Sequence, residues 1–206
     1  MLKLLYFPGT ISLAVQVALE DAGADYETAL VDFRTDEQRG ADYLAINPKS
    51  RVPALVTDRG VLTEAPAILA FIAQSYPQAN LAPLDDPYAY GEVQAFNTYL
   101  CATVHVAMAH GIRGYRWADD PAAITEMKRK SKEVVTDCFS VIEKAYVKGP
   151  FVMGEAYSIC DPYLFTLSGW LDRDGIDRTQ FPRIDGHFHR IAERATVRKV
   201  LAAWAA

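Results

Sequence analysis

Two stretches of the sequence place polar residues where a helix is expected to begin. In "YFPGTISLA", an apolar strand ends at a Pro-Gly turn, and Thr10 and Ser12 supply hydroxyl groups at the start of the helical pattern that follows. In "LTEAPAIL", Glu64 directly precedes another predicted helix. The free N–H groups at a helix start attract anions, so both stretches are candidates for binding a charged ligand. Each also has a structural interpretation, with Ser12 as a helix N-cap and Glu64 as a partner of the helix dipole.

A third stretch, "NPKSRVPALV", places Val52 directly before Pro53 at the start of an apolar run. Proline has no N–H to give to a sheet, so Pro53 is expected at the first position of a strand or on an edge. The bond between these two residues is also of the one kind in which a cis peptide costs little.

One face of a predicted long helix, from Tyr88 to Met108, carries further polar groups. Asn97, Cys101, His105 and Met108 follow one another at spacings of four, four and three residues, which places them on nearly one side of a helix. A histidine in this position could act as a hydrogen-bond donor or general base, or it could simply pack.

The elements that hold these residues divide the chain into two predicted domains. Residues 1–77 alternate strand and helix signals in the order βαβαββα, which predicts an α/β domain. Residues 78–86 lack periodicity and have the composition of a linker. Residues 87–206 show only helical patterns, one of them opened by an S-x-x-D capping box from Ser158 to Asp161, and predict an all-α domain.

Composition excludes several classes of protein. The 206 residues include 21 Lys and Arg and 26 Asp and Glu, a net charge of −5, which argues against binding to nucleic acid. The run "KRKSK" lies in a helical pattern and is interpreted as a solvated face. No secretory signal and no apolar run of membrane-spanning length is visible, and Cys101, Cys138 and Cys160 fit neither a disulfide framework nor a metal site. We therefore expect a cytoplasmic protein with buried thiols, no metal, and no membrane or nucleic-acid partner.

Four motifs in register carry a family resemblance across essentially the whole chain. In order, "PGTISL", "NPKSRVPAL", "LTEAPAI" and "SICDPYLF" resemble motifs of the cytosolic glutathione transferases. The similarity is greatest to bacterial beta-type members, in which "PGACSL", "NPxGxVPAL", "LTExxAI" and "SVADIYLF" are typical. Each motif is weak alone, but the set is specific. The resemblance implies a thioredoxin-like N-terminal domain, an all-helical C-terminal domain, a homodimer and glutathione as co-substrate.

The resemblance also implies contacts to glutathione. A cis bond before Pro53 would turn the main chain of Val52 outward, where the cysteinyl unit would pair with it as a short added strand. Glu64 would take the γ-glutamyl ammonium, and the N–H of Ala65, where the family often has serine, would take the adjacent carboxylate. Arg51 would hold the glycyl carboxylate, although a solvated surface position explains Arg51 equally well.

The long helix also matches the beta type, but with a departure. Asn97 matches an asparagine of the beta-type helix and is expected near glutathione. The histidine and lysine found about two turns later in that type correspond here to Val104 and His105, which leaves both a catalytic and a packing role open for His105.

The active-site turn departs from the beta type at Ile11, which stands where those enzymes carry a cysteine. Mixed-disulfide chemistry is therefore not expected, and the thiolate of glutathione needs another partner. Lowering a thiol pKa by two units takes about 2.7 kcal/mol, and one hydroxyl donating to a charged acceptor contributes roughly 1.5–3 kcal/mol. Ser12 is the first candidate for that hydroxyl and Thr10 the second, whereas Tyr6 is expected to point into the core.

The electrophile site is the least defined part of the resemblance. With Ile11 and Met108, the aromatic residues Tyr115 and Trp117 of an irregular segment could line a pocket for a small hydrophobic electrophile. A loop held by Arg–Asp pairs explains the same residues. Alternatives for the function are a glutathione-dependent isomerase, reductive dehalogenase or peroxidase, and a non-enzymatic binding or interaction protein on the same fold.

Overall fold

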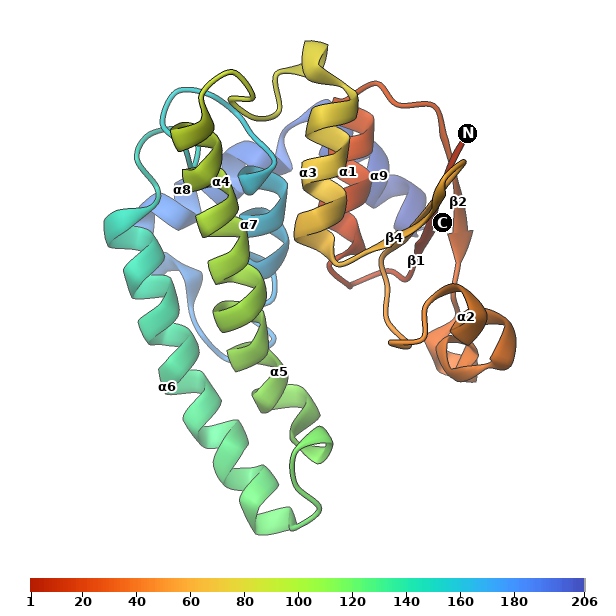
Figure 1. The fold of residues 1–206 in the computed structure, drawn as a ribbon. Coiled ribbons are helices and arrows are strands. Elements are labelled where there is room, and N and C mark those ends of the chain that lie inside the picture. Colours follow the sequence, from red (N-terminus) through yellow and green to blue (C-terminus); the bar gives the residue numbers. More distant parts are fainter. Residues whose placement is uncertain (206) are drawn as a thin grey trace. The chain divides into compact units, whose positions relative to one another are not determined.

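The structure is a computed structural model that describes residues 1–205, and its chain forms two compact units (Figure 1). The first unit consists of residues 1–91 and 193–206, and the second of residues 92–192. The predicted all-α domain of residues 87–206 differs from the second unit at both ends, because residues 87–91 and the segment from residue 193 belong to the first unit.

A four-stranded sheet organises the first unit, in the strand order β2-β1-β3-β4. β1 (Leu2–Tyr6) pairs in parallel with β2 (Tyr26–Leu30), as a strand–helix–strand unit requires, and antiparallel with β3 (Ala54–Thr57). β3 and β4 (Gly60–Thr63) form the predicted hairpin, with Ala54 opposite Thr63. The α/β prediction for this part is confirmed, and the sheet is of the thioredoxin-like kind.

Helices α1 (Ser12–Asp21) and α3 (Ala65–Ser75) pack against each other in the first unit (Figure 1). The weaker helix expected between β2 and β3 is present, but it is shorter than the helical pattern in the sequence predicts. Two 3₁₀ turns, Phe33–Thr35 and Glu37–Arg39, precede α2 (Ala41–Ile46), because Gly40 is extended and interrupts the helix.

The C-terminal helix α9 (Ala195–Ala205) packs on α1 and thereby joins the first unit. Its Trp204 Nε1 donates to Gln16 Oε1 at 2.7 Å, and Arg194 Nη2, just before the helix, donates to Asp21 Oδ1 at 2.8 Å. The Trp204 ring also stacks on Tyr6, with centroids 5.4 Å apart. These contacts explain why the sequence-based boundary misplaced this segment: its partners lie almost the whole chain away.

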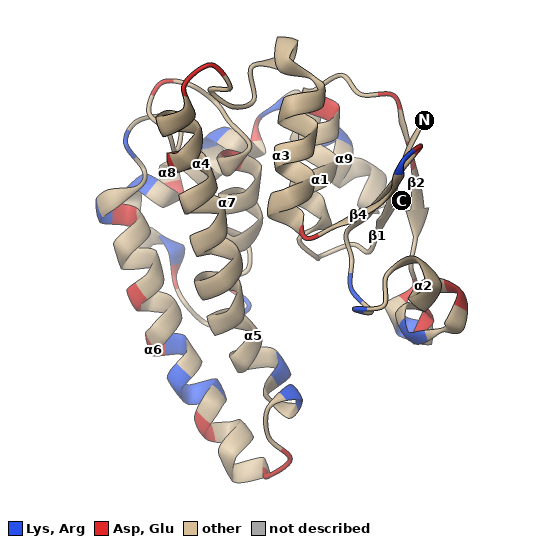
Figure 2. Cartoon of the chain, viewed as in Figure 1, with Lys and Arg blue, Asp and Glu red and all other residues tan. Residues whose placement is uncertain are grey.

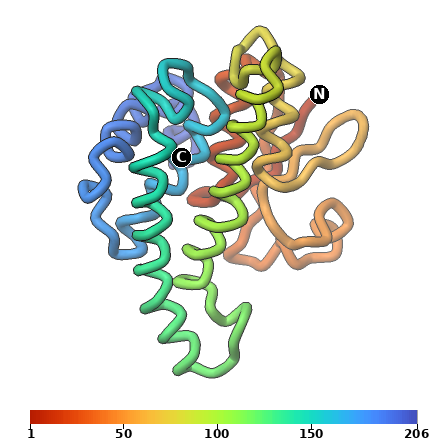
Figure 3. The backbone as a smooth tube through the Cα atoms, turned by 60° about the vertical axis from the view of Figure 1, so that its left-hand side comes forward, coloured from red at the N-terminus to blue at the C-terminus, as the bar shows by residue number. Residues whose placement is uncertain are grey.

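The second unit is helical, as predicted, and its long helix is continuous but irregular (Figure 3). α4 (Pro87–Tyr99) passes into a π-helical stretch, η4 (Leu100–Val104), and then α5 (His105–Arg113). Within η4 the N–H of His105 donates to the carbonyl of Leu100, five residues back. The regular period on which the predicted shared face of Asn97, Cys101, His105 and Met108 was based therefore does not hold across η4.

Three more helices complete the second unit. α6 (Pro121–Ala145) runs beside α5 in both views (Figures 1 and 3), and α7 (Cys160–Ser168) packs on α8 (Pro182–Ala192). One half of the predicted capping box forms, because the N–H of Ser158 donates to Asp161 Oδ2 at 2.7 Å. Ser158 Oγ accepts from the N–H of Cys160 at 3.3 Å instead of from Asp161, and Ile159 is the N-cap residue of α7.

Charge along α6 is mixed in sign (Figure 2). Arg129 pairs with Glu126 and Glu133, and Lys130 also pairs with Glu133, all on exposed side chains. The basic run of the sequence is thus a solvated helix face, as predicted. Across residues 1–205, every helix is too short or too polar to cross a bilayer.

Candidate functional site

The start of α1 brings two hydroxyl groups together. Thr10 Oγ1 lies 2.6 Å from the carbonyl oxygen of Phe7 and 3.0 Å from Ser12 Oγ, and it accepts from the N–H of Ser12 at 3.3 Å. Because a hydroxyl has one proton, donation to Phe7 leaves Thr10 Oγ1 as an acceptor for the hydroxyl of Ser12. Thr10 is half-buried, whereas Ser12 is completely buried. Of the two residues, Thr10 is the one with exposed surface.

The neighbours of this pair have structural roles. Ile11 is the N-cap residue of α1 and is buried, so Ser12 begins the helix and does not cap it. The ring stacking with Trp204 accounts for Tyr6, consistent with a packing role.

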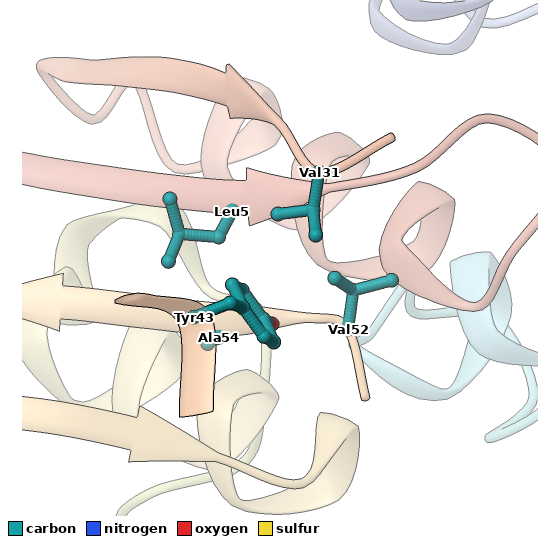
Figure 4. Close-up of a cluster of buried hydrophobic side chains, with 5 residues drawn as sticks. All are labelled: Leu5, Val31, Tyr43, Val52 and Ala54. Atoms are coloured by element: carbon teal, nitrogen blue, oxygen red, sulfur yellow. The ribbon is translucent and has the colours of Figure 1, made fainter. Parts of the chain in front are cut away.

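The Val52–Pro53 peptide bond is cis, as the family resemblance implies. The side chain of Val52 is buried against Leu5, Val31, Tyr43 and Ala54, and Figure 4 shows these five side chains turned toward one another. The strand ladders begin at Ala54, so the main chain of Val52 lies beyond them. This combination anchors the residue by its side chain while its N–H and C=O lie outside the sheet.

Two residues that the sequence reasoning missed hold the loop before Val52. Tyr43 Oη and Asn47 Nδ2 both donate to the carbonyl of Arg51 at 2.7 Å, and Asn47 Oδ1 accepts from the N–H of Lys49 at 3.2 Å. Asn47 is buried, and burial raises the pKa of Tyr43 to about 12. The Asn-Pro pair at the start of this loop was the available signal, since Asn before Pro is a turn former.

Glu64 is the N-cap residue of α3 and has a left-handed backbone, with φ 72° and ψ 115°. A non-glycine residue at positive φ is held there by its surroundings at a cost of order 1–3 kcal/mol, and such strain concentrates at functional sites. Its carboxylate accepts from Lys49 Nζ at 2.5 Å. Ala65, the first residue of α3, is buried. Continuing the β3–β4 register by one residue places Glu64 opposite Pro53.

Arg51 is exposed, and its carbonyl rather than its side chain carries the hydrogen bonds of this loop. Val52, Pro53, Glu64 and Ala65 are thus brought into one part of the first unit by the β3–β4 pairing. The start of α1, with Thr10, Ile11 and Ser12, belongs to the same unit. The predicted site residues of the second unit are Asn97, His105, Met108, Tyr115 and Trp117.

Asn97 is completely buried in α4, and within residues 1–205 no hydrogen-bond partner is placed at its Nδ2 or its Oδ1. A buried amide with both ends unpaired is costly, at about 1–3 kcal/mol for each group. Native proteins seldom retain such a group without a reason.

The remaining predicted residues of the second unit differ in exposure. His105, at the start of α5, packs edge-on against Trp170 with ring centroids 5.2 Å apart. Met108 is buried, whereas Tyr115 and Trp117 are exposed. Trp117 stacks on His110 at 4.1 Å.

A groove of about 200 Å³ lies between α5 and α6, and three of its six lining residues are apolar. None of the residues predicted for the electrophile pocket lines it. The lining residues are Ala107, His110, Met127, Lys130, Ser131 and Val134.

Comparison with known proteins places this architecture in a family. Residues 1–74 match the glutathione S-transferase N-terminal domain. Glutathione S-transferase GstA of Escherichia coli O157:H7 is 30% identical over 205 residues, covering 98% of both chains. A maleylacetoacetate isomerase of Pseudomonas aeruginosa is 27% identical, covering 92% of this chain and 88% of its own. A crystal structure of a Sulfitobacter glutathione transferase homologue with bound glutathione is 42% identical, with a TM-score of 0.95 and 98% of each chain covered.

The chain therefore belongs to the cytosolic glutathione S-transferase family, and a bacterial beta-class enzyme is among its structural neighbours. Its thioredoxin-like sheet and helical second unit are those the resemblance implied. Ile11 remains a difference from the beta-type motif that supplied the comparison.

Proposed function

We propose that the protein is a glutathione transferase that adds the thiolate of glutathione to a small hydrophobic electrophile. The observation that carries the proposal is the pairing of β3 with β4, which holds the Val52 main chain and the Glu64 carboxylate in one part of the first unit. The glutathione bound to the Sulfitobacter homologue supports the same ligand here.

In this proposal the N–H and C=O of Val52 pair with the cysteinyl unit of glutathione, as an added strand does. Glu64 takes the γ-glutamyl ammonium, and the N–H of Ala65 takes its carboxylate at the start of α3. The exposed side chain of Arg51 takes the glycyl carboxylate. The unpaired amide of Asn97, which can both donate and accept, is a further proposed contact.

The thiol is proposed to ionise at the start of α1. A hydroxyl that donates to a thiolate contributes roughly 1.5–3 kcal/mol, and a helix start adds about 0.3–1 kcal/mol, which together cover a pKa decrease of one to two units. The exposure of Thr10 favours it as the group nearest the sulfur. With glutathione bound, its proton is proposed to turn from the Phe7 carbonyl to the thiolate, while the buried Ser12 hydroxyl donates to Thr10 Oγ1. Packing against Trp170 gives His105 a structural role that needs no bound ligand. The proposal for thiol ionisation therefore rests on the hydroxyls of Thr10 and Ser12.

Absorbance of the thiolate across a pH series with bound glutathione tests this mechanism. Thr10→Val and Ser12→Ala are each expected to raise the apparent thiol pKa by about one unit, equivalent to about 1.4 kcal/mol. Ser140→Ala, which removes a hydroxyl from α6, is the matched control. An unchanged pKa in both variants would remove the start of α1 from the mechanism.

The match to a maleylacetoacetate isomerase favours one alternative, a glutathione-dependent isomerase. Assays of the wild-type enzyme with an aryl halide, an organic hydroperoxide and maleylacetoacetate separate transferase, peroxidase and isomerase activity. Retention on immobilised glutathione without turnover of any of these would instead support a binding or interaction protein.

Two further features belong to the proposal. The first is a homodimer, which light scattering on the eluting protein would detect. The second is residence in the reducing cytoplasm, supported by Cys101, Cys138 and Cys160, none of which forms a disulfide.

A further inference from the structure

Lys49 makes two charge-assisted hydrogen bonds beside the proposed peptide site. Its Nζ donates to Glu64 Oε1 at 2.5 Å and to Thr63 Oγ1 at 2.6 Å. The Lys49 side chain is 43% exposed and that of Glu64 is 52% exposed, so both charges remain open to a ligand.

Both ends of this ion pair are fixed by the backbone. The N–H of Lys49 is bound by the buried Asn47, whose amide also bonds the Arg51 carbonyl. Thr63 is paired with Ala54 in the hairpin, and Glu64 follows it in its left-handed conformation. An exposed pair between freely moving side chains contributes little, but here the loop and the hairpin set the positions of both backbones.

The start of α3 offers fewer donors than most helix starts. Its first residue, Ala65, has no hydroxyl, and its second, Pro66, has no N–H. A carboxylate at this helix start therefore meets one N–H fewer than usual and no side-chain donor from the helix. The Lys49 ammonium, which is bonded to Glu64, is a cation that could replace these missing donors.

The γ-glutamyl end of glutathione carries an ammonium and a carboxylate on the same carbon. Glu64 alone can pair only with the ammonium. The Lys49–Glu64 pair places a positive and a negative charge side by side, one for each charged group of the ligand. We propose that Lys49 is a glutathione-binding residue: its ammonium pairs with the γ-glutamyl α-carboxylate while Glu64 pairs with the α-ammonium. The inference rests on the proposed function and adds Lys49 as a cation at the γ-glutamyl end of the proposed glutathione site.

Calorimetric titration with glutathione and two analogues tests the assignment. One analogue, γ-aminobutyryl-cysteinyl-glycine, lacks the α-carboxylate, and the other, glutaryl-cysteinyl-glycine, lacks the α-ammonium. Lys49→Met is expected to weaken glutathione binding about tenfold or more, the effect of losing one charge-assisted bond. It should leave the affinity for the analogue without the carboxylate unchanged. Lys49→Arg should restore most of the affinity for glutathione.

Lys3→Met removes the same charge from an exposed position on β1 and is the matched control. Equal weakening of all three ligands by Lys49→Met would overturn the inference, because Lys49 would then only support the loop. Tighter binding of glutathione would also overturn it, since Lys49 would then compete with the ligand for Glu64. If wild-type protein binds none of the three peptides, the proposed function itself fails; if it binds glutathione and Lys49→Met binds it equally well, only this inference fails.

Discussion

His187 Nε2 lies 2.9 Å from Asp161 Oδ1, and both side chains are completely buried. The same carboxylate accepts from the N–H groups of Val152 at 2.8 Å and Ser158 at 2.7 Å. One side chain thus ties the loop before α7, the start of α7 and the middle of α8 together. The capping box predicted from the sequence is only one part of this cluster.

Asp161→Ala is expected to destabilise the protein by at least about 3 kcal/mol, because it leaves several buried donors unpaired at about 1–3 kcal/mol each. Urea unfolding followed by circular dichroism measures the change in the free energy of unfolding. Asp137→Ala, at an exposed position of α6, is the control and should change it by less than about 0.5 kcal/mol. Equal effects of the two substitutions would contradict the role assigned to the cluster.

Tyr43 gives the first unit a dependence on alkaline pH. Burial raises its pKa to about 12, above its usual value of 10, so the folded protein holds this proton more tightly than the unfolded chain. The contribution of Tyr43 to the free energy of unfolding is complete below pH 10. As the pH rises from 10 toward 12 this contribution is lost, by up to about 2.7 kcal/mol. Urea unfolding of wild type and Tyr43→Phe at pH 8, 10 and 11 measures this contribution. The difference in the free energy of unfolding between the two proteins should decrease as the pH rises. A difference that does not change with pH would show that the hydrogen bond from the Tyr43 hydroxyl to the Arg51 carbonyl does not contribute in this way.

The sequence determined the order of elements because each depends on local signals. Alternating apolar residues, the break at Gly23 and the turn before β4 predicted the βαβαββα order that the structure has. Partners across the fold could not be predicted in this way. Lys49 and Glu64 meet only because β3 and β4 pair in one particular register, and α9 joins the first unit through residues at the opposite end of the chain.

The long helix shows a different limit of sequence reasoning. The predicted shared face for Asn97 and His105 assumed a regular helical period, whereas the π turn of η4 lies between the two residues and changes their angular relation. Nothing in the composition of "LCATV" marks a π turn, because its residues occur equally well in an ordinary helix. The burial of Asn97 with an unpaired amide was likewise visible only in three dimensions.

The cysteines should differ sharply in reactivity. Cys138 and Cys160 are buried, and burial raises the pKa of both thiols, whereas Cys101 on η4 is only half-buried. Because the thiolate is the reactive form, at most one thiol of the native protein should react rapidly with Ellman's reagent at pH 8, against three after unfolding. Cys101→Ser should abolish the rapid phase. Rapid reaction of two or more thiols would contradict the burial of Cys138 and Cys160.

Asn47 should matter for ligand binding as well as for stability. Its amide donates to the Arg51 carbonyl and accepts from Lys49, so it fixes the loop that leads into Val52. Asn47→Ala is expected to cost about 1–3 kcal/mol of stability and, if the proposed site is correct, to weaken glutathione binding. Asn47→Asp keeps the shape and the acceptor but turns a negative oxygen toward the Arg51 carbonyl, so it should weaken binding at least as much. Gln78→Ala, which removes an amide from an exposed position of the same unit, is the control. Calorimetric titration with glutathione measures the effect of each variant on affinity, and urea unfolding measures its effect on stability. If the affinity stays constant while the stability falls, Asn47 acts on folding alone.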